Sequence, residues 1–139
     1  MIRRTPIKKK SDKKILREEI GKLHFEYLKA KRGSRDELSG RPAKSLGRFH
    51  IIPISECPKL EFIDENVLLV NWMPLHYWWH QDYKKAQRIV EPLIIKLRGP
   101  DYRERLLAID KMQPKHSRFY LQTLKMWFEK EMRKSLTRF

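Results

Sequence analysis

Apolar residues near the start of the chain recur at the spacing of an α-helix. Five of them share one helical face, namely Leu16, Ile20, Leu23, Tyr27 and Leu28. Ser11 and Asp12 can cap such a helix, because their side-chain oxygens accept hydrogen bonds from its first backbone N–H groups. The pattern therefore predicts a helix that runs to about Lys31 and ends before Gly33.

The middle of the chain changes to short apolar runs. Residues 49–52 predict a strand that ends at Pro53, whose backbone has no N–H to donate to a sheet. Residues 66–71, rich in β-branched and apolar side chains, predict a second strand. Residues 33–47 hold three of the five glycines and predict a loop or a tight hairpin, whereas residues 53–63 are irregular in pattern.

Three further helices are expected after the second strand. The first starts at Pro74, which fits the first turn of a helix, and runs to about Val90 before Pro92 breaks or kinks it. The others cover residues 101–112 and 117–136, and the last carries an apolar stripe of Tyr120, Leu121, Leu124, Trp127, Phe128 and Met132. That stripe fits either the core of one chain, closed over the N-terminal helix, or the seam of a dimer. The whole pattern predicts a mostly helical α+β fold.

The composition fits one folded domain. With 139 residues, 40% of them apolar, and four tryptophans, the chain is long enough for one compact core. Residues 1–10 predict a flexible basic arm before a single domain over 11–139. The longest apolar runs, 67–70 and 93–95, are too short to span a bilayer, and residues 1–14 lack the apolar centre of a secretion signal. We therefore expect a cytoplasmic protein with no membrane partner.

Positive charge narrows the expected partners. The 32 Lys+Arg and 17 Asp+Glu residues give a net charge of +15 at pH 7. Residues 1–48 carry +10 (16 Lys+Arg, 6 Asp+Glu), residues 49–82 carry −4 (1 and 5), and residues 83–139 carry +9 (15 and 6). A small acidic segment inside a basic body fits a protein that presents a polyanion to a metal ion. Nucleic acid is the first expected partner and an anionic membrane surface the second; charge that serves only solubility is the weaker alternative.

Four polar residues of the acidic segment form a candidate site. His50 lies on the first predicted strand, and Asn66 opens the second. His76 and His80 lie four residues apart on the next helix, so both rings share one face and can hold one divalent cation. Taken alone, this pair among the aromatic residues 77–79 fits an aromatic cluster better. The order strand, strand, helix favours a ββα-metal site, in which a neutral imidazole takes a proton from water.

A spaced pattern joins the two strands: His50, Pro58, Leu60, Phe62 and Asn66. In this pattern the chain resembles the HNH (ββα-metal) endonuclease superfamily and, within it, the NinG (Rap) family of phage recombination proteins. The resemblance covers about residues 33–85. It implies a small ββα core, placed over about 47–90. The basic flanks, including the C-terminal helices expected over 101–136, match the family only in composition. The resemblance also implies cleavage of branched recombination intermediates in a bacterial or phage-infected cell.

The resemblance assigns roles to the candidate residues. His50 would be the general base, and Asn66 would orient it. The catalytic Mg²⁺ or Mn²⁺ would be bound by His76 and His80, together with Asn66. The implied reaction is metal-dependent hydrolysis of phosphodiester bonds in DNA, and the alternative is a non-catalytic DNA- or RNA-binding protein on a degenerate HNH scaffold. A homodimer is a further expectation, because paired cuts at a twofold junction need two active sites.

Three features depart from the family pattern. Residues 36–39 and 71–74 stand where many members carry two Cys-x-x-Cys pairs, and the chain has a single cysteine, Cys57, so no structural zinc is expected. Phe49 stands where an Asp or His usually binds the metal, so that a nearby carboxylate such as Asp64 would have to help. The interval from the asparagine to the helix histidines is one residue longer than the common form, which leaves the choice between them open.

DNA contacts are expected from basic residues along the chain. The set comprises Arg3, Arg4, Lys8, Lys9, Lys10, Arg41, Lys44, Arg48, Lys84 and Lys85. His24 and His116 lie at helix positions in basic surroundings, where a surface position or core packing is the expected role. Cys57 is expected to be a small buried residue.

Overall fold

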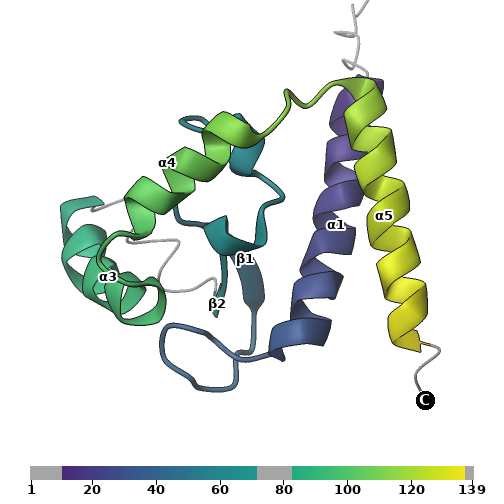
Figure 1. Cartoon of the computed structure of the whole chain (residues 1–139). Coiled ribbons are helices and arrows are strands. Elements are labelled where there is room, and N and C mark those ends of the chain that lie inside the picture. Colours follow the sequence, from purple (N-terminus) through teal and green to yellow (C-terminus); the bar gives the residue numbers. More distant parts are fainter. Residues whose placement is uncertain (1–10, 72–82, 137–139) are drawn as a thin grey trace, which may run out of the picture.

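A computed structural model describes residues 11–71 and 83–136 of the chain (Figure 1). This part is a mostly helical α+β fold, as predicted, with four helices and one two-stranded antiparallel sheet. The elements are α1 (Asp12–Arg32), β1 (Leu46–His50), β2 (Val67–Asn71), α3 (Tyr83–Arg98), α4 (Tyr102–Met112) and α5 (Arg118–Leu136), with 3-10 turns at Pro58–Leu60 and Asp64–Asn66. The expected arm over residues 1–10 and the expected helix start at Pro74 fall outside the described residues.

Helix α1 confirms the boundaries predicted from its apolar stripe. The Ser11 hydroxyl accepts a hydrogen bond from the Lys14 N–H at 3.2 Å and so caps the first turn. Gly33 has a φ of +87°, which a residue with a Cβ rarely adopts, and its N–H donates to the Lys29 carbonyl oxygen. The stripe itself faces the core, where the buried members are Ile20, Tyr27 and Leu28.

Strand β1 lies earlier in the chain than predicted, whereas β2 matches its prediction to within one residue. The two strands pair antiparallel, and the ladder ends with His50 opposite Val67. Beyond this point the N–H and carbonyl groups of Ile52 bond to the side chain of Asn66 instead of to the backbone of β2. His50 is therefore the last residue of its strand, where the chain turns away from the sheet.

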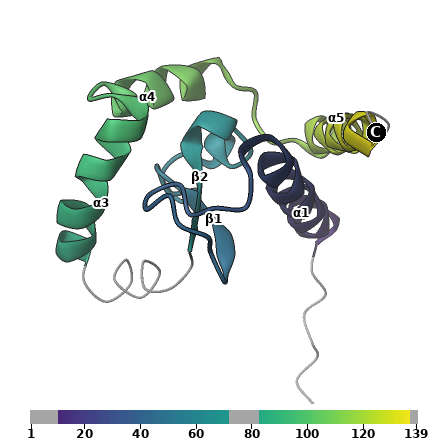
Figure 2. The same ribbon diagram turned by 90° about the horizontal axis from the view of Figure 1, so that it is seen from below.

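Helices cover both faces of the sheet, because β2 is apolar on both of its sides. Val67 and Leu69 pack in a cluster with residues of α1 and α5. Leu68 and Val70, which point the other way along an extended chain, pack with residues of α3 and α4. Figures 1 and 2 show the resulting order of layers, with the sheet between the two pairs of helices.

The first and last helices, α1 and α5, lie side by side and run in the same direction (Figure 1). Two ion pairs between the helices agree with this parallel arrangement. Arg118 lies 3.6 Å from Asp12, and further along the pair Lys125 lies 2.5 Å from Glu19. Helices α1 and α5 therefore close one face of the sheet together.

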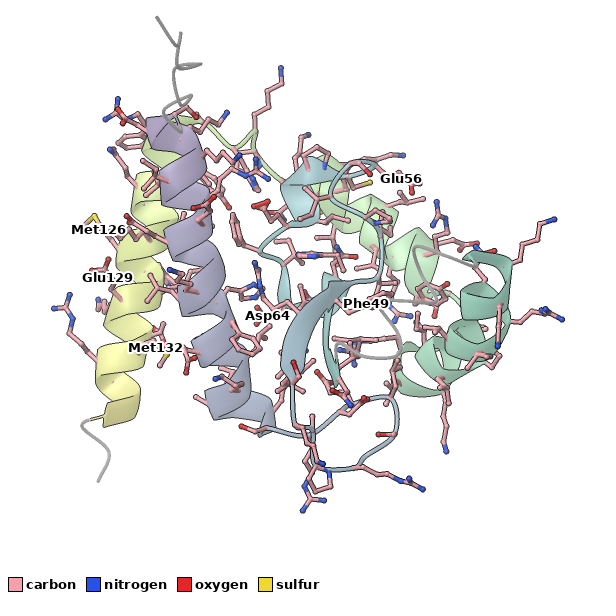
Figure 3. The ribbon with its side chains drawn as sticks, turned by 180° about the vertical axis from the view of Figure 1, so that it is seen from behind. Phe49, Glu56, Asp64, Met126, Glu129 and Met132 are labelled. Carbon is pink, nitrogen blue, oxygen red and sulfur yellow. The ribbon has the colours of Figure 1, made fainter. Side chains whose placement is uncertain are left out.

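The apolar stripe of α5 belongs mainly to the core. Leu121 and Phe128 are buried in the cluster that includes α1. Trp127 is 45% exposed, and Met126, outside the stripe, is 70% exposed and points away from α1 (Figure 3). The idea that the stripe is a dimer seam is thus wrong for Leu121 and Phe128, because one chain already covers them.

Helix α3 continues through Pro92 to Arg98, so the expected break at this proline is wrong. Proline removes one backbone donor from the helix, and its ring crowds the preceding turn. Val90 and Ile94, on either side of Pro92, are both buried in the same apolar cluster. Their burial ties both halves of the helix to one surface, which favours a continuous helix despite the proline.

Candidate active site around His50

The tautomer of His50 follows from a single hydrogen bond. Its Nε2 lies 2.9 Å from the carbonyl oxygen of Glu61. A carbonyl oxygen can only accept, so Nε2 must carry the hydrogen and Nδ1 must carry the lone pair. The residue predicted to be a general base therefore presents a basic nitrogen whose ring orientation is fixed by the backbone.

Burial keeps the His50 imidazole neutral. The pKa of His50 is lowered from its usual 6.5 to about 4, mainly by desolvation; the hydrogen bond to the Glu61 carbonyl opposes this shift and the positive charge of Arg48 adds to it. At pH 7 the ring is thus almost entirely unprotonated. A general base must be unprotonated before it can accept a proton from water, and His50 meets this requirement.

Asn66 holds the chain around His50 in place. Its fully buried side chain accepts a hydrogen bond from the Ile52 N–H at 2.8 Å and donates to the carbonyl oxygens of Ile52 (3.1 Å) and Leu60 (3.3 Å). The Asn66 side chain thus acts as a clamp between Ile52, which is two residues from His50, and Leu60, which is next to Glu61. The arrangement fits the expected orienting role, acting through the backbone. A metal-ligand role for Asn66 does not fit, because backbone groups surround the amide.

A buried carboxylate near His50 has its own cationic partner. Glu61 is only 4% exposed, and Arg17 donates to it from Nε at 3.0 Å and from Nη2 at 2.5 Å. Such a two-pronged pair compensates part of the cost of burying the charge. The sequence reasoning missed both residues. The position of Glu61 between Leu60 and Phe62, two residues of the spaced pattern, was the signal that could have indicated a buried carboxylate.

A second chain of hydrogen bonds passes through His24, which is fully buried. Arg48 donates from Nη1 to Nδ1 of His24 at 3.1 Å, so Nε2 carries the hydrogen and donates to Asp64 at 3.0 Å. Burial lowers the pKa of His24 and so favours this neutral form. The structure thus gives His24 a packed position, as expected, and adds a hydrogen-bonded role that the sequence did not indicate.

Arg48, one of the expected DNA contacts, is partly buried and turns its side chain toward α1. Its guanidinium bonds to His24 and lies close to α1. A Cβ atom added at Gly21 would lie 2.6 Å from Nη2 of Arg48, so the glycine makes room for this side chain. Burial lowers the pKa of Arg48, which is the cost of holding the charge away from water. The expected phosphate contact from Arg48 stays a prediction.

Phe49 and Asp64 lie on opposite sides of β1 (Figure 3). Phe49 packs against the apolar cluster that includes α3 and α4. Asp64 lies by α1, where its carboxylate bonds to His24. The residue at the usual metal-ligand position therefore makes apolar contacts, and the carboxylate considered as its substitute is already paired.

The predicted metal ligands lie beyond the described part of the chain. Within residues 11–71 and 83–136, no three His, Cys, Asp or Glu side chains come close enough to share a metal ion. His76 and His80, the proposed ligands, fall outside these residues, as do Arg3, Arg4, Lys8, Lys9 and Lys10 of the expected DNA contacts. The remaining expected contacts are all exposed: Arg41, Lys44, Lys84 and Lys85.

A third histidine, His116, stacks on Phe62, the residue after Glu61. Its ring lies 5.6 Å from that of Phe62 and 5.6 Å from that of Tyr120. Burial lowers the pKa of His116; the negative charge of Glu61 opposes this shift, whereas the charges of Arg17 and Lys13 add to it. Packing against aromatic rings is thus part of its role.

Comparisons with known proteins give no relative: no protein-family model, no curated protein and no solved structure matches the chain. None of the helices in the described part combines the length and the apolar character needed to cross a membrane.

Proposed function

We propose that this chain is a divalent-metal-dependent DNA endonuclease of HNH type, with His50 as its general base. The supporting observation is the hydrogen bond from Nε2 of His50 to the Glu61 carbonyl, which leaves the lone pair on Nδ1. Burial keeps that nitrogen unprotonated by lowering the pKa of His50 to about 4. A net charge of +15 supplies the attraction for a polyanion.

The chemistry at His50 is proton transfer from water. Nδ1 takes one proton while the water oxygen forms a bond to phosphorus, and the bond from phosphorus to the leaving oxygen breaks with the electron pair going to that oxygen. A bound Mg²⁺ or Mn²⁺, held by His76 and His80, would stabilise the charge on the phosphate and the leaving oxygen. Asn66 acts only as a positioning residue in this proposal.

Branched DNA is the proposed substrate class, and a bacterial or phage-infected cytoplasm is the proposed location. Both rest on the resemblance to NinG-like proteins. Paired cuts across a junction would need two copies of the chain. The homodimer stays a prediction, and its interface must use surfaces other than Leu121 and Phe128, which are buried within one chain.

A second candidate is a nucleic-acid-binding protein without catalysis. The observation that favours it is Phe49, which packs against an apolar cluster at the position where related sites carry a metal ligand. Loss of that ligand would weaken metal binding and leave the basic charge in place. Binding and cleavage therefore have to be measured separately.

The test uses purified protein with linear duplex, flap, splayed-arm and four-way junction DNA. Each substrate is incubated with Mg²⁺, with Mn²⁺ and with EDTA. The endonuclease proposal expects nicks with at least one metal, strongest on a branched substrate, and none in EDTA. Tight binding without cleavage in any metal would favour the second candidate instead.

A further inference from the structure

Three segments that are far apart in the sequence converge on the dipeptide Glu61-Phe62. His50, at the end of β1, bonds to the Glu61 carbonyl oxygen. Arg17, from α1, holds the Glu61 carboxylate, and His116, from the segment before α5, stacks on the ring of Phe62 at 5.6 Å. Arg17 and His116 therefore lie within one residue of the carbonyl that orients the proposed base.

Positive charge gathers at this point. Lys13 is exposed and precedes Arg17 by four residues, so the two side chains share one face of α1. The charged groups that act on His116 are Glu61, Arg17 and Lys13, and the negative one of these is already paired with Arg17. His116 therefore has two cationic neighbours, Arg17 and Lys13, and one anionic neighbour, Glu61. In the sequence, the basic residues 1–10 join directly to this end of α1.

We propose that Lys13, Arg17 and His116 form a phosphate-binding surface that holds the DNA backbone beside His50. Arg17 is 40% exposed in its side chain and uses Nε and Nη2 for Glu61, which leaves the Nη1 group to donate to a phosphate oxygen. Lys13 adds a mobile point charge. The inference rests on the proposed DNA substrate and names where that substrate lies.

His116 gives this surface a dependence on pH. Burial and the two neighbouring cations lower the pKa of His116, so the free protein holds it neutral at pH 7. A phosphate close to the ring favours the protonated form and raises that pKa. Because DNA binding and protonation then support each other, DNA should bind more tightly as the pH falls from 7.5 to 6.

The test measures DNA binding in EDTA, where metal-dependent cleavage cannot occur. Fluorescence anisotropy with a labelled duplex over a range of salt concentrations compares the wild type with Lys13→Gln and His116→Gln. The matched control is Lys22→Gln: Lys22 is also exposed on α1 but lies nine residues, or about two and a half turns, from Lys13, on the opposite face. Arg17 is left in place, because its loss would leave the buried Glu61 carboxylate unpaired.

Lys13→Gln should weaken binding and reduce the log–log salt slope by about 0.9, the value for one phosphate contact on duplex DNA. His116→Gln should remove the tightening between pH 7.5 and 6 that the wild type shows. Lys22→Gln should leave both properties unchanged. Any one of three results would overturn the proposed surface. They are a wild-type salt slope in Lys13→Gln, a wild-type pH response in His116→Gln, and a loss of DNA affinity in Lys22→Gln equal to that in Lys13→Gln.

Two further results separate this surface from the proposed function. If the variants behave as expected but the wild type cuts no substrate in any metal, the surface stands and the endonuclease proposal fails. If a duplex RNA of the same length binds more tightly than the DNA and shows the same losses in the variants, the surface binds RNA, and its assignment to DNA is overturned.

Discussion

At His50, the direction of one hydrogen bond determines which nitrogen can act as a base. The Glu61 carbonyl fixes the hydrogen on Nε2, and Asn66 fixes the chain on both sides of that contact. Burial then sets the protonation state. The chemistry of the candidate base therefore depends on backbone geometry, which side-chain substitutions at His50 and Asn66 can test separately.

The lowered pKa of His50 makes stability depend on pH. The pKa is about 4 in the folded chain, against about 6.5 for an exposed histidine. As the pH falls, the unfolded chain binds the proton first, so the contribution of His50 is complete above pH 6.5 and is lost as the pH falls toward 4. That difference corresponds to at most roughly 3 kcal/mol.

The measurement is urea unfolding of the wild type and of His50→Gln between pH 7.5 and 5. The variant should lose less stability over this range than the wild type. His24, whose pKa is also lowered by burial, contributes in the same direction in both proteins. Identical pH dependence of the two unfolding free energies would contradict the buried, neutral His50.

Asn66→Ala should destabilise the chain strongly. The substitution leaves the N–H and carbonyl groups of Ile52 without their partner inside the protein, at a cost of about 2–5 kcal/mol in unfolding free energy. The control is Asn71→Ala at the end of β2, where the side chain is only partly buried, and a change within about 1 kcal/mol is expected. Both unfolding free energies are measured by chemical denaturation. Equal decreases in the two variants would contradict the structural role given to the Asn66 side chain.

At the scale of elements, α5 tests whether the C-terminal stripe is core. Phe128→Ala should lower the free energy of unfolding by about 3–5 kcal/mol, because the ring is buried against α1. Met126→Ala, on the exposed side of the same helix, should change it by less than about 0.5 kcal/mol. Thermal unfolding followed by circular dichroism compares both with the wild type. An unfolding free energy that is unchanged in Phe128→Ala would indicate that α5 is not part of the monomer core.

The elements that the sequence predicted well are those with a local signal. The ends of α1 follow from Ser11 and Gly33, and β2 follows from a single apolar run. The end of β1 was misplaced because a side chain fourteen residues away, Asn66, takes the backbone groups of Ile52. Pro92 was misread because burial on both sides of it outweighs its local preference.

In the candidate site, too, the residues with a local sequence signal were predicted, and those held by contacts between distant segments were missed. His50 and Asn66 were named from a spaced pattern, and the structure shows how the chain holds them. Arg17 and Glu61 were missed because the pair joins residues 44 positions apart, and no local pattern records such a contact. The hydrogen bond between Arg48 and His24 was missed for the same reason, since the two residues are 24 positions apart.

At the scale of the whole molecule, α1 and α5 close one face of the sheet, and α3 and α4 close the other (Figure 2). The end of β1 carries His50 between these layers, close to residues of α1 and of the segment before α5. His50, Arg17 and His116 thus all contact the dipeptide Glu61-Phe62, and only the folded chain brings these segments together.

The most direct test is single-turnover cleavage of a branched DNA by the wild type and by His50→Gln, with Mn²⁺ present and protein in excess. Glutamine can still donate to the Glu61 carbonyl but offers no basic nitrogen, so the fold and DNA binding in EDTA should be retained. The cleavage rate should fall by a factor on the order of 10²–10⁴. A His50→Gln chain that cuts at the wild-type rate would contradict the assignment of His50 as the general base.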